Sequence, residues 1–199
     1  MQDQMRKDFF ETHGAGWEER NYTPGKREQV RRMVQAFALK EGQRVLDVGC
    51  GEGILFPYVR EALGASGGII ALDPSEGMLK GAAQKNEALL IQAEAEHIPL
   101  IANYVDQVIC FAAFPHVADK KQAVREFFRV LRAGGKVFIA HLMNRDELSA
   151  HHEKHHAVRQ DRLPNFEDMN QLFVSAGFAQ TYLDEKPGWY LFVAEKGSE

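Results

Sequence analysis

The sequence predicts an α/β fold in which a doubly wound, mostly parallel sheet ends in an antiparallel hairpin. From residue 44 onward, short apolar runs alternate with segments of helical spacing. Such alternation indicates parallel strands that are joined by right-handed helical crossovers. The last two extended runs, 180–183 and 189–194, are separated only by a turn that contains Pro187 and Gly188. No helix fits between them, so these runs predict the terminal hairpin.

The segment ahead of the first strand predicts an aromatic arm and then a helix. Residues 1–24 are rich in aromatic and turn-forming residues, which is typical of a short helix within an irregular arm. Its aromatic residues include Phe9, Phe10, Trp17 and Tyr22. A helix over 25–40 follows, because apolar residues recur there at helical spacing. These residues are Val30, Met33, Val34, Phe37 and Ala38.

The remaining elements follow in alternation. Continuous apolar runs such as 108–111 are typical of strands that are buried on both faces of a sheet. The predicted strands before the hairpin are 44–48, 68–72, 88–92, 105–111 and 136–141. The predicted helices are 54–63, 75–85, 119–131 and 166–176, and Gly177 ends the last of them.

Composition indicates one soluble domain over 1–199. The chain has 24 Lys and Arg against 28 Asp and Glu, a net charge of −4, which argues against a nucleic-acid partner. No apolar run approaches the roughly 20 residues that span a bilayer. Two cysteines make no disulfide framework, and the N-terminus lacks the pattern of a signal peptide. We therefore expect a cytoplasmic protein with no membrane span, and the oligomeric state stays open.

The loop after the first strand carries glycine at alternate positions, Gly49, Gly51 and Gly53. Glycine lets a ligand approach the backbone closely. A dinucleotide would favour a third glycine at position 54, where this chain has Ile54. Asp47 also precedes the loop, and a carboxylate there suits a cationic ligand with an amino group and a sulfonium better than it suits a pyrophosphate.

This loop resembles the first motif of the class I methyltransferases, D-x-G-x-G-x-G, and matches it in full. The resemblance implies a Rossmann-like sheet of seven strands in the order 3-2-1-4-5-7-6. It also implies S-adenosyl-L-methionine as cofactor, S-adenosyl-L-homocysteine as product, and Cys50 as a further residue of the cofactor loop.

Later motifs of the same family fall in order as far as residue 136. An apolar run ends at Asp73, about 20 residues after the last glycine, where a carboxylate can accept both hydrogen bonds of a ribose diol. Asp73, Pro74 and Met78 resemble D-x-S-x-x-M-L, which implies Met78 against the adenine; a plain core role is the alternative. Glu94 and Ala95 resemble the start of the adenine-binding segment D-A-E-x-L-P-F, with Glu94 where Asp is usual. Cys110 and Phe111 end the strand of the fourth motif, near the reactive methyl group.

Two histidines fall where an acceptor would bind, because ligands of open α/β sheets lie at the carboxyl ends of the strands. His116 follows the fourth predicted strand and His141 ends the fifth. Either could orient or deprotonate an acceptor, since imidazole titrates near neutral pH. A capping or half-buried histidine is the alternative for His116.

The segment 142–164 is an insert rich in histidine. If it is helical, His151 and His155 form one i, i+4 pair and His152 and His156 form another. Together with His141, such pairs could bind a divalent metal over the methyl group, with Asp161 also near. A solvated, charged helix is the other interpretation.

The sequence as a whole favours methyl transfer to a small-molecule acceptor. The arm resembles the F-D-x-x-A-x-x-W-D opening of quinone and small-molecule methyltransferases, which implies that it walls the acceptor site; packing on the sheet edge is equally consistent. Methylation of a protein or RNA is the alternative within the enzyme class. A cofactor-binding or metal-responsive module without transfer activity is the alternative outside it.

Overall fold

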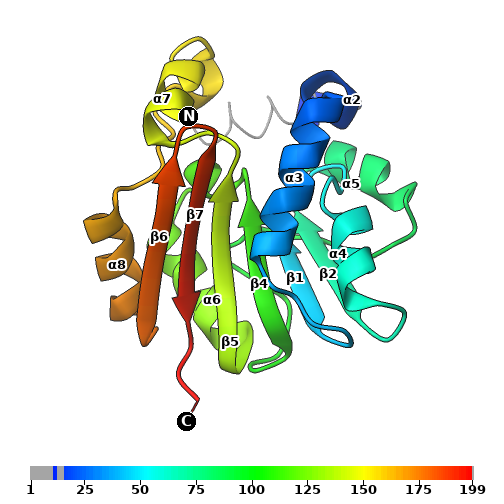
Figure 1. The fold of residues 1–199 in the computed structure, drawn as a ribbon, viewed down its shortest axis with the longest axis vertical. Helices are drawn as coiled ribbons and strands as arrows, with labels where there is room; N and C mark the ends of the chain where they lie inside the picture. Colours follow the sequence, from blue (N-terminus) through cyan, green and yellow to red (C-terminus); the bar gives the residue numbers. More distant parts are fainter. Residues whose placement is uncertain (1–10, 13–15, 199) are drawn as a thin grey trace.

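The computed structural model describes residues 11–12 and 16–198, which form a seven-stranded sheet (Figure 1). The strand order is β3-β2-β1-β4-β5-β7-β6, which confirms the predicted order. The strands are β1 (Arg44–Val48), β2 (Gly68–Asp73), β3 (Leu89–Gln92), β4 (Val105–Phe111), β5 (Leu131–His141), β6 (Gln180–Lys186) and β7 (Trp189–Glu195). The first five are parallel, and β7 pairs antiparallel with both β5 and β6. The predicted hairpin is therefore confirmed.

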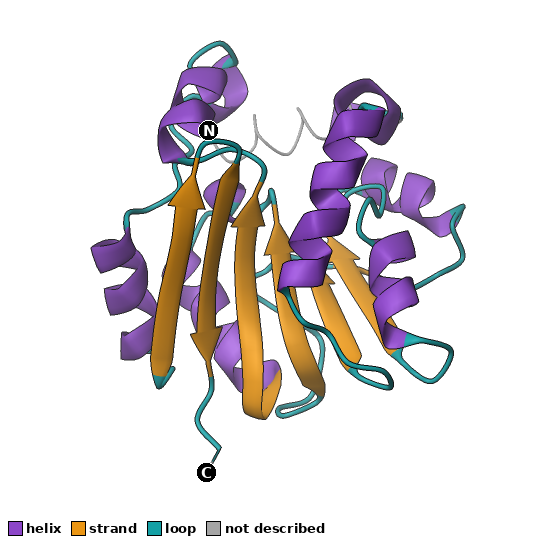
Figure 2. Ribbon diagram, in the orientation of Figure 1, coloured by secondary structure: helices purple, strands orange, loops and turns teal. Residues whose placement is uncertain are grey.

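Helices cover both faces of this sheet (Figure 2). They are α2 (Trp17–Asn21), α3 (Pro24–Ala36), α4 (Phe56–Leu63), α5 (Glu76–Ala83), α6 (Lys120–Val130), α7 (Arg145–His152) and α8 (Phe166–Ser175), with 3-10 turns η1 (Phe114–His116) and η2 (His156–Val158). Several begin at a side chain that accepts a backbone N–H, as Thr23, Ser75 and Asp119 do. Such caps satisfy N–H groups that the helix itself leaves unpaired.

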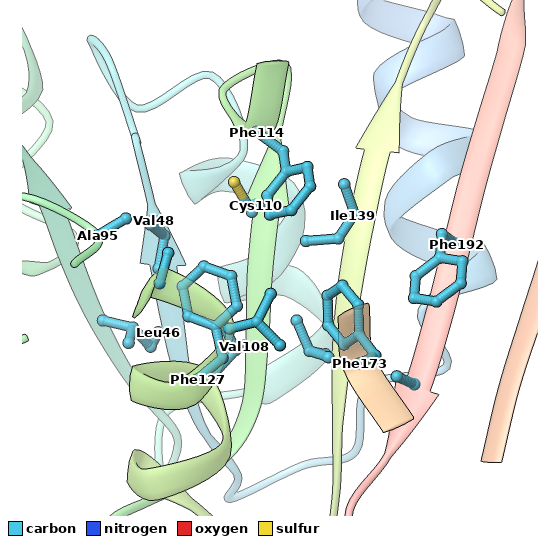
Figure 3. Close-up of a cluster of buried hydrophobic side chains, with 14 of the residues drawn as sticks. Leu46, Val48, Ala95, Val108, Cys110, Phe114, Phe127, Ile139, Phe173 and Phe192 are labelled. Carbon is cyan, nitrogen blue, oxygen red and sulfur yellow. The ribbon is translucent and has the colours of Figure 1, made fainter. Parts of the chain in front are cut away.

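Two apolar clusters join these helices to the sheet. One packs α6 and α8 against the strands, and Figure 3 shows Phe127 and Phe173 beside Val108 and Ile139 within it. The other packs α3 and α4. Burial of each large apolar side chain contributes about 1.5–3 kcal/mol, so the strands that end at the site stand on a well-packed core.

Several predicted boundaries differ from the structure; the strand expected over 180–183, for example, extends to Lys186. Two of the differences have clear local reasons. The helix expected over 25–40 ends at Ala36, because Ala38 adopts a left-handed φ of 49°. Ala38 is accordingly exposed and does not extend the buried stripe. The strand expected from 136 begins at Leu131, which pairs with Val105 ahead of an irregularity in the register.

The carboxyl ends of the parallel strands meet along one edge of the sheet. In Figure 1, α7 rises beyond that edge on one side, and α2 with the start of α3 rises on the other. Phe9 and Phe10 of the predicted arm lie outside the described residues. Among the residues that are described, no helix has the length and apolar character needed to cross a membrane.

Candidate functional site

A cavity of about 780 Å³ opens along this edge, and both flanking segments contribute to its wall. The ends of β1, β2, β4 and β5 contribute Val48, Asp73, Phe111 and His141. The cavity lies where the chain turns to opposite sides of the sheet between β1 and β4, which is the usual ligand site of open α/β folds. Its size suits a small molecule rather than a folded partner.

The glycine loop forms one wall of the cavity. Gly49 has φ of 71°, and a Cβ built on it would lie 2.3 Å from the Cβ of Ala113, so the two segments touch there. Gly51 has φ of 53°, and a Cβ on it would be 3.8 Å from the sulfur of Met78. The amides of Gly49 and Cys50 both donate to the carbonyl of Leu72, at 2.8 and 3.0 Å. These hydrogen bonds thus fix the loop to β2, while Gly49 and Gly51 line the cavity.

Asp73 is held rigidly beside that loop. Its Oδ2 accepts the N–H of Gly51 and its Oδ1 accepts the N–H of Ser75, each at 2.9 Å. Burial raises the pKa of Asp73, and these two backbone hydrogen bonds oppose that rise. A carboxylate has about four lone-pair sites, so Asp73 can still accept two hydrogen bonds, as a ribose diol requires.

Asp47, next to the end of β1, is a buried carboxyl that has an unsatisfied oxygen. It is 2% exposed, and its Oδ2 has no hydrogen-bond partner among the residues that the structure describes. Burial, followed by the charge of Asp73, raises the pKa of Asp47 to about 7. A buried polar atom without a partner is costly, and Asp47 lines the cavity. An ammonium group of a ligand would both donate to it and stabilise its charge.

Most of the predicted cofactor residues line the cavity together: Asp47, Gly49, Cys50, Gly51, Asp73, Pro74, Met78, Glu94, Ala95 and Phe111. Two do not. Gly53 lies against Phe56, whose ring would be 2.5 Å from a Cβ at that position, so its glycine serves packing. Cys110 is fully buried in the core beside Phe114, as Figure 3 shows, and burial raises the pKa of its thiol.

The N-terminal arm is tied to the glycine loop by a residue that the sequence analysis passed over. Glu52 accepts the N–H of Gly16 at 2.9 Å and that of Glu18 at 2.6 Å, so it caps the start of α2. Lys85 of the segment after α5 bonds both Glu18 and the carbonyl of Gly53. Trp17 and Tyr22 of the arm line the cavity. The described part of the arm therefore packs at the sheet edge and lines the cavity, and its role at an acceptor site stays a prediction.

A second carboxylate ties the arm to the start of α5. Glu11 accepts the hydroxyl hydrogen of Ser75 at 2.7 Å and the N–H of Gly77 at 3.1 Å. Glu11 stands at the acidic position of the arm's F-D resemblance, but no local pattern predicts its contacts or those of Glu52, because their partners lie 34 or more residues away in the chain.

The opposite end of the cavity is lined by His116, His141, His151, His152 and His155. His116 Nδ1 lies 2.7 Å from Asp161 Oδ2, and its ring packs on that of His152 with 5.2 Å between centroids. His152 Nδ1 lies 2.8 Å from the carbonyl oxygen of Asp161. The structure thus brings both predicted catalytic histidines to one chamber and adds Asp161 behind His116.

Two of these histidines are neutral at physiological pH. Burial lowers the pKa of His141 to about 3, and neighbouring histidines add to the effect. His141 Nδ1 accepts the N–H of Met143 at 3.0 Å, so its other ring nitrogen carries the hydrogen. Burial likewise lowers the pKa of His152 to about 4. A carbonyl only accepts, so His152 donates from Nδ1 to Asp161.

Of the two histidine pairs expected for the insert, one forms and one does not. The rings of His151 and His155 lie together, with 5.1 Å between their centroids. Helix α7 ends at His152, and the 3-10 turn η2 begins only at His156, so His152 and His156 do not share a helical face. Asn144 starts α7 with a capping box, and the turn that follows is set by the buried contact between His152 and Asp161. His156 does not line the cavity. Within the described ranges, no three His, Cys, Asp or Glu side chains are placed to hold a metal ion, and a metal at this place stays a prediction from the sequence.

Sequence comparison relates the central part of the chain to known enzymes. The model of a family described as "Methyltransferase domain" matches residues 46–139. The ubiquinone/menaquinone biosynthesis C-methyltransferase UbiE of Edwardsiella ictaluri is 33% identical over 113 residues, which are 53% of this chain and 45% of that protein. The chain therefore spans about half the length of the curated relatives that it matches.

Solved structures share the fold over nearly the whole chain. Phosphoethanolamine N-methyltransferase 2 of Haemonchus contortus superposes with a TM-score of 0.80 at 19% identity, over 96% of this chain and 60% of that one. An S-adenosylmethionine-dependent methyltransferase of Aquifex aeolicus gives a TM-score of 0.65 at 22% identity, over 88% of this chain and 98% of the other. At these identities the likeness is one of fold.

Proposed function

We propose a methyl transfer reaction for this chain, which belongs to the class I S-adenosylmethionine-dependent methyltransferases through the domain at residues 46–139. The acceptor in this proposal is a small molecule that occupies the histidine end of the cavity. The observation that carries the proposal is a buried carboxyl, Asp47, whose Oδ2 has no partner among the described residues and which lines the same cavity as the glycine loop and Asp73.

The cofactor end fits S-adenosylmethionine group by group. Asp47 would accept from the cofactor's amino group, and Asp73 would accept from its ribose hydroxyls. Met78, Glu94 and Ala95 would border the adenine. When bound, the cofactor supplies a methyl carbon that its sulfonium makes electrophilic.

This chain's own residues would then position the acceptor and exclude water. Much of the catalysis of a direct displacement comes from alignment of the reacting atoms. Trp17 and Tyr22 would close the cavity from the side of the arm, and α7 would close it from the other side. His141, neutral with its hydrogen on the ring nitrogen away from Met143, would donate a hydrogen bond to the acceptor, while His116 would contact the reacting group.

Calorimetry tests the cofactor assignment directly. The chain should bind S-adenosylhomocysteine, and Asp73→Ala should weaken this binding by about 10- to 100-fold, the scale of a lost hydrogen bond to a charged group. Because Asp73 also holds the amide of Gly51, Asp73→Asn serves as a second variant that keeps one acceptor oxygen, and we expect an intermediate loss.

Asp168→Ala is the matched control, since this carboxylate is exposed in the first turn of α8 and does not line the cavity. It should leave the affinity unchanged. Unaltered binding by Asp73→Ala, or tight binding of NAD in place of S-adenosylhomocysteine, would contradict the proposed function.

A further inference from the structure

We propose that His116 and Asp161 act as a base and its positioning partner, and that the acceptor is accordingly a neutral compound with a weakly acidic O–H or S–H group. This inference rests on the proposed methyl transfer and names the acceptor class for it. Among the histidines that line the cavity, His116 contacts a carboxylate, that of Asp161.

The contact fixes which nitrogen of His116 carries the hydrogen. Nδ1 lies 2.7 Å from Oδ2 of Asp161, and a carboxylate only accepts, so Nδ1 donates and Nε2 bears the lone pair. Asp161 itself is 4% exposed and does not line the cavity, whereas His116 does. The carboxylate therefore stands behind the ring, on the side away from the cavity.

Asp161 is itself held in place by the insert. Its N–H donates to the carbonyl of Val158 at 2.9 Å. Its own carbonyl accepts the Nδ1–H of His152, which burial keeps neutral. Asp161, in the loop after η2, is thus contacted from two further segments: η1 bonds its carboxylate through His116, and α7 bonds its backbone carbonyl through His152. Such fixing of a base through a second group is the arrangement that activates nucleophiles in many enzymes.

The charges around the ring favour proton uptake by His116. The ionisable groups that the described residues place near it include Asp161, His141, His152 and Lys120. Both histidines are neutral, and the ammonium of Lys120 is bonded to the carbonyls of Pro115 and Val117. A buried carboxylate in contact with the ring stabilises the imidazolium that forms when the ring takes a proton.

The reaction balances without any further reactant. His116 Nε2 takes the proton of the acceptor's O–H or S–H group. The acceptor's oxygen or sulfur forms a bond to the methyl carbon as the carbon–sulfur bond of the sulfonium breaks. That bond's electron pair stays on the departing sulfur, which becomes a neutral thioether, and His116 afterwards releases the proton to water. A neutral amine already has its lone pair available and needs no such base before attack.

The test uses phenols and aromatic thiols of graded acidity with Asp161→Asn and His116→Gln. General bases typically contribute about 10²- to 10⁴-fold, so we expect each variant to lose about 100-fold or more in kcat on acceptors that are un-ionised at the assay pH. On acceptors already ionised at that pH, the loss should fall below about 10-fold, because no proton needs to be removed. The double variant should lose little more than His116→Gln alone, since the pair acts as a unit.

Two measurements separate this inference from the proposed function. Binding of S-adenosylhomocysteine should be unchanged in both variants, and His97→Gln, an exposed histidine outside the cavity, should match the unmodified chain throughout. An equal loss on ionised and un-ionised acceptors, or methylation of amines alone, would overturn the base assignment while methyl transfer stands. Failure of the unmodified chain to bind S-adenosylhomocysteine would instead overturn the proposed function.

Discussion

The two ends of the cavity are built from the chain in different ways. The cofactor end takes its groups in order from strand ends and adjoining loops between Asp47 and Ala95. The histidine end gathers His116, His141, His152 and Asp161 from η1, β5, α7 and the loop after η2. Short sequence motifs therefore determine the cofactor end, whereas the histidine end forms only when the insert folds back over the sheet edge.

The two ends of the cavity also differ in their charged and titratable groups. The cofactor end holds buried carboxyls, of which Asp47 has a pKa raised by burial to about 7 and an oxygen without a partner among the described residues. The histidine end holds imidazoles that burial keeps neutral, with one carboxylate set behind His116. One end is thus prepared to receive a cation and the other to exchange a proton, as transfer of a methyl group between them would require.

The largest effect should come from the point where the two ends touch. In Gly49→Ala the new Cβ would lie 2.3 Å from the Cβ of Ala113, and the residue would hold a left-handed φ of 71°. Ala113 precedes η1, so relief of the clash displaces His116 as well. We expect a loss of affinity for S-adenosylhomocysteine of more than about 100-fold and a destabilisation of about 2–4 kcal/mol, measured by calorimetry and urea unfolding.

Gly25→Ala is the control for that variant. Gly25 lies in α3 with nothing within 4 Å of a Cβ, and alanine favours a helix by up to about 1 kcal/mol. Stability should therefore hold or rise, with unchanged binding. A Gly49→Ala variant that binds like Gly25→Ala would show that the two ends are not coupled through this contact.

The contrast also explains what could be predicted from the sequence. The strand order, the hairpin and ten of the cofactor-end residues follow from local patterns, because each strand ends in its own motif. Gly53 and Cys110 belong to the same motifs but face Phe56 and the core. A motif fixes the backbone path, whereas the direction of a side chain depends on what packs beside it.

The histidine end could be predicted only in part, since its key contacts join distant residues. His116 and Asp161 are 45 positions apart, and no periodicity links them. Helical spacing suggested His152 with His156, but burial of His152 against the carbonyl of Asp161 ends α7 before that pair can form. A tertiary contact here overrides a local preference.

An intermediate effect is expected at Asp47, where charge alone can be removed. Folding raises the pKa of Asp47 from 3.8 to about 7. The protonated form is favoured in the folded state, so this contribution to stability is present below about pH 4 and is lost as pH rises through 7. Asp47→Asn has no carboxyl to ionise and so avoids that loss. Between pH 5 and pH 8, without cofactor, its free energy of unfolding should rise relative to that of the unmodified chain by on the order of 3 kcal/mol.

Binding should move in the opposite direction. The ammonium of the cofactor needs the ionised carboxylate, so the affinity of the unmodified chain for S-adenosylhomocysteine should rise with pH up to about 7 and then level off. Asp47→Asn should bind at least about 10-fold more weakly at pH 7.5 and show no such rise. Equal pH profiles for the two proteins in calorimetry would contradict the role of Asp47 at the cofactor end.

The smallest effect concerns the arm, which borders both ends. Glu52→Gln weakens the cap on Gly16 and Glu18, and loss of such a cap costs about 0.5–2 kcal/mol. Contacts of Glu18 with Lys85 and Arg27 remain, so the arm should become more mobile without detaching. We expect dissociation of S-adenosylhomocysteine to become about 2- to 5-fold faster in stopped-flow measurements.

Glu28→Gln is the control, because it alters an exposed pair with Arg32 on α3 and should not change this dissociation rate. If Glu52→Gln instead slows acceptor turnover and leaves cofactor dissociation unaltered, the arm acts on the histidine end, although its hydrogen bonds to Glu52 attach it to the glycine loop.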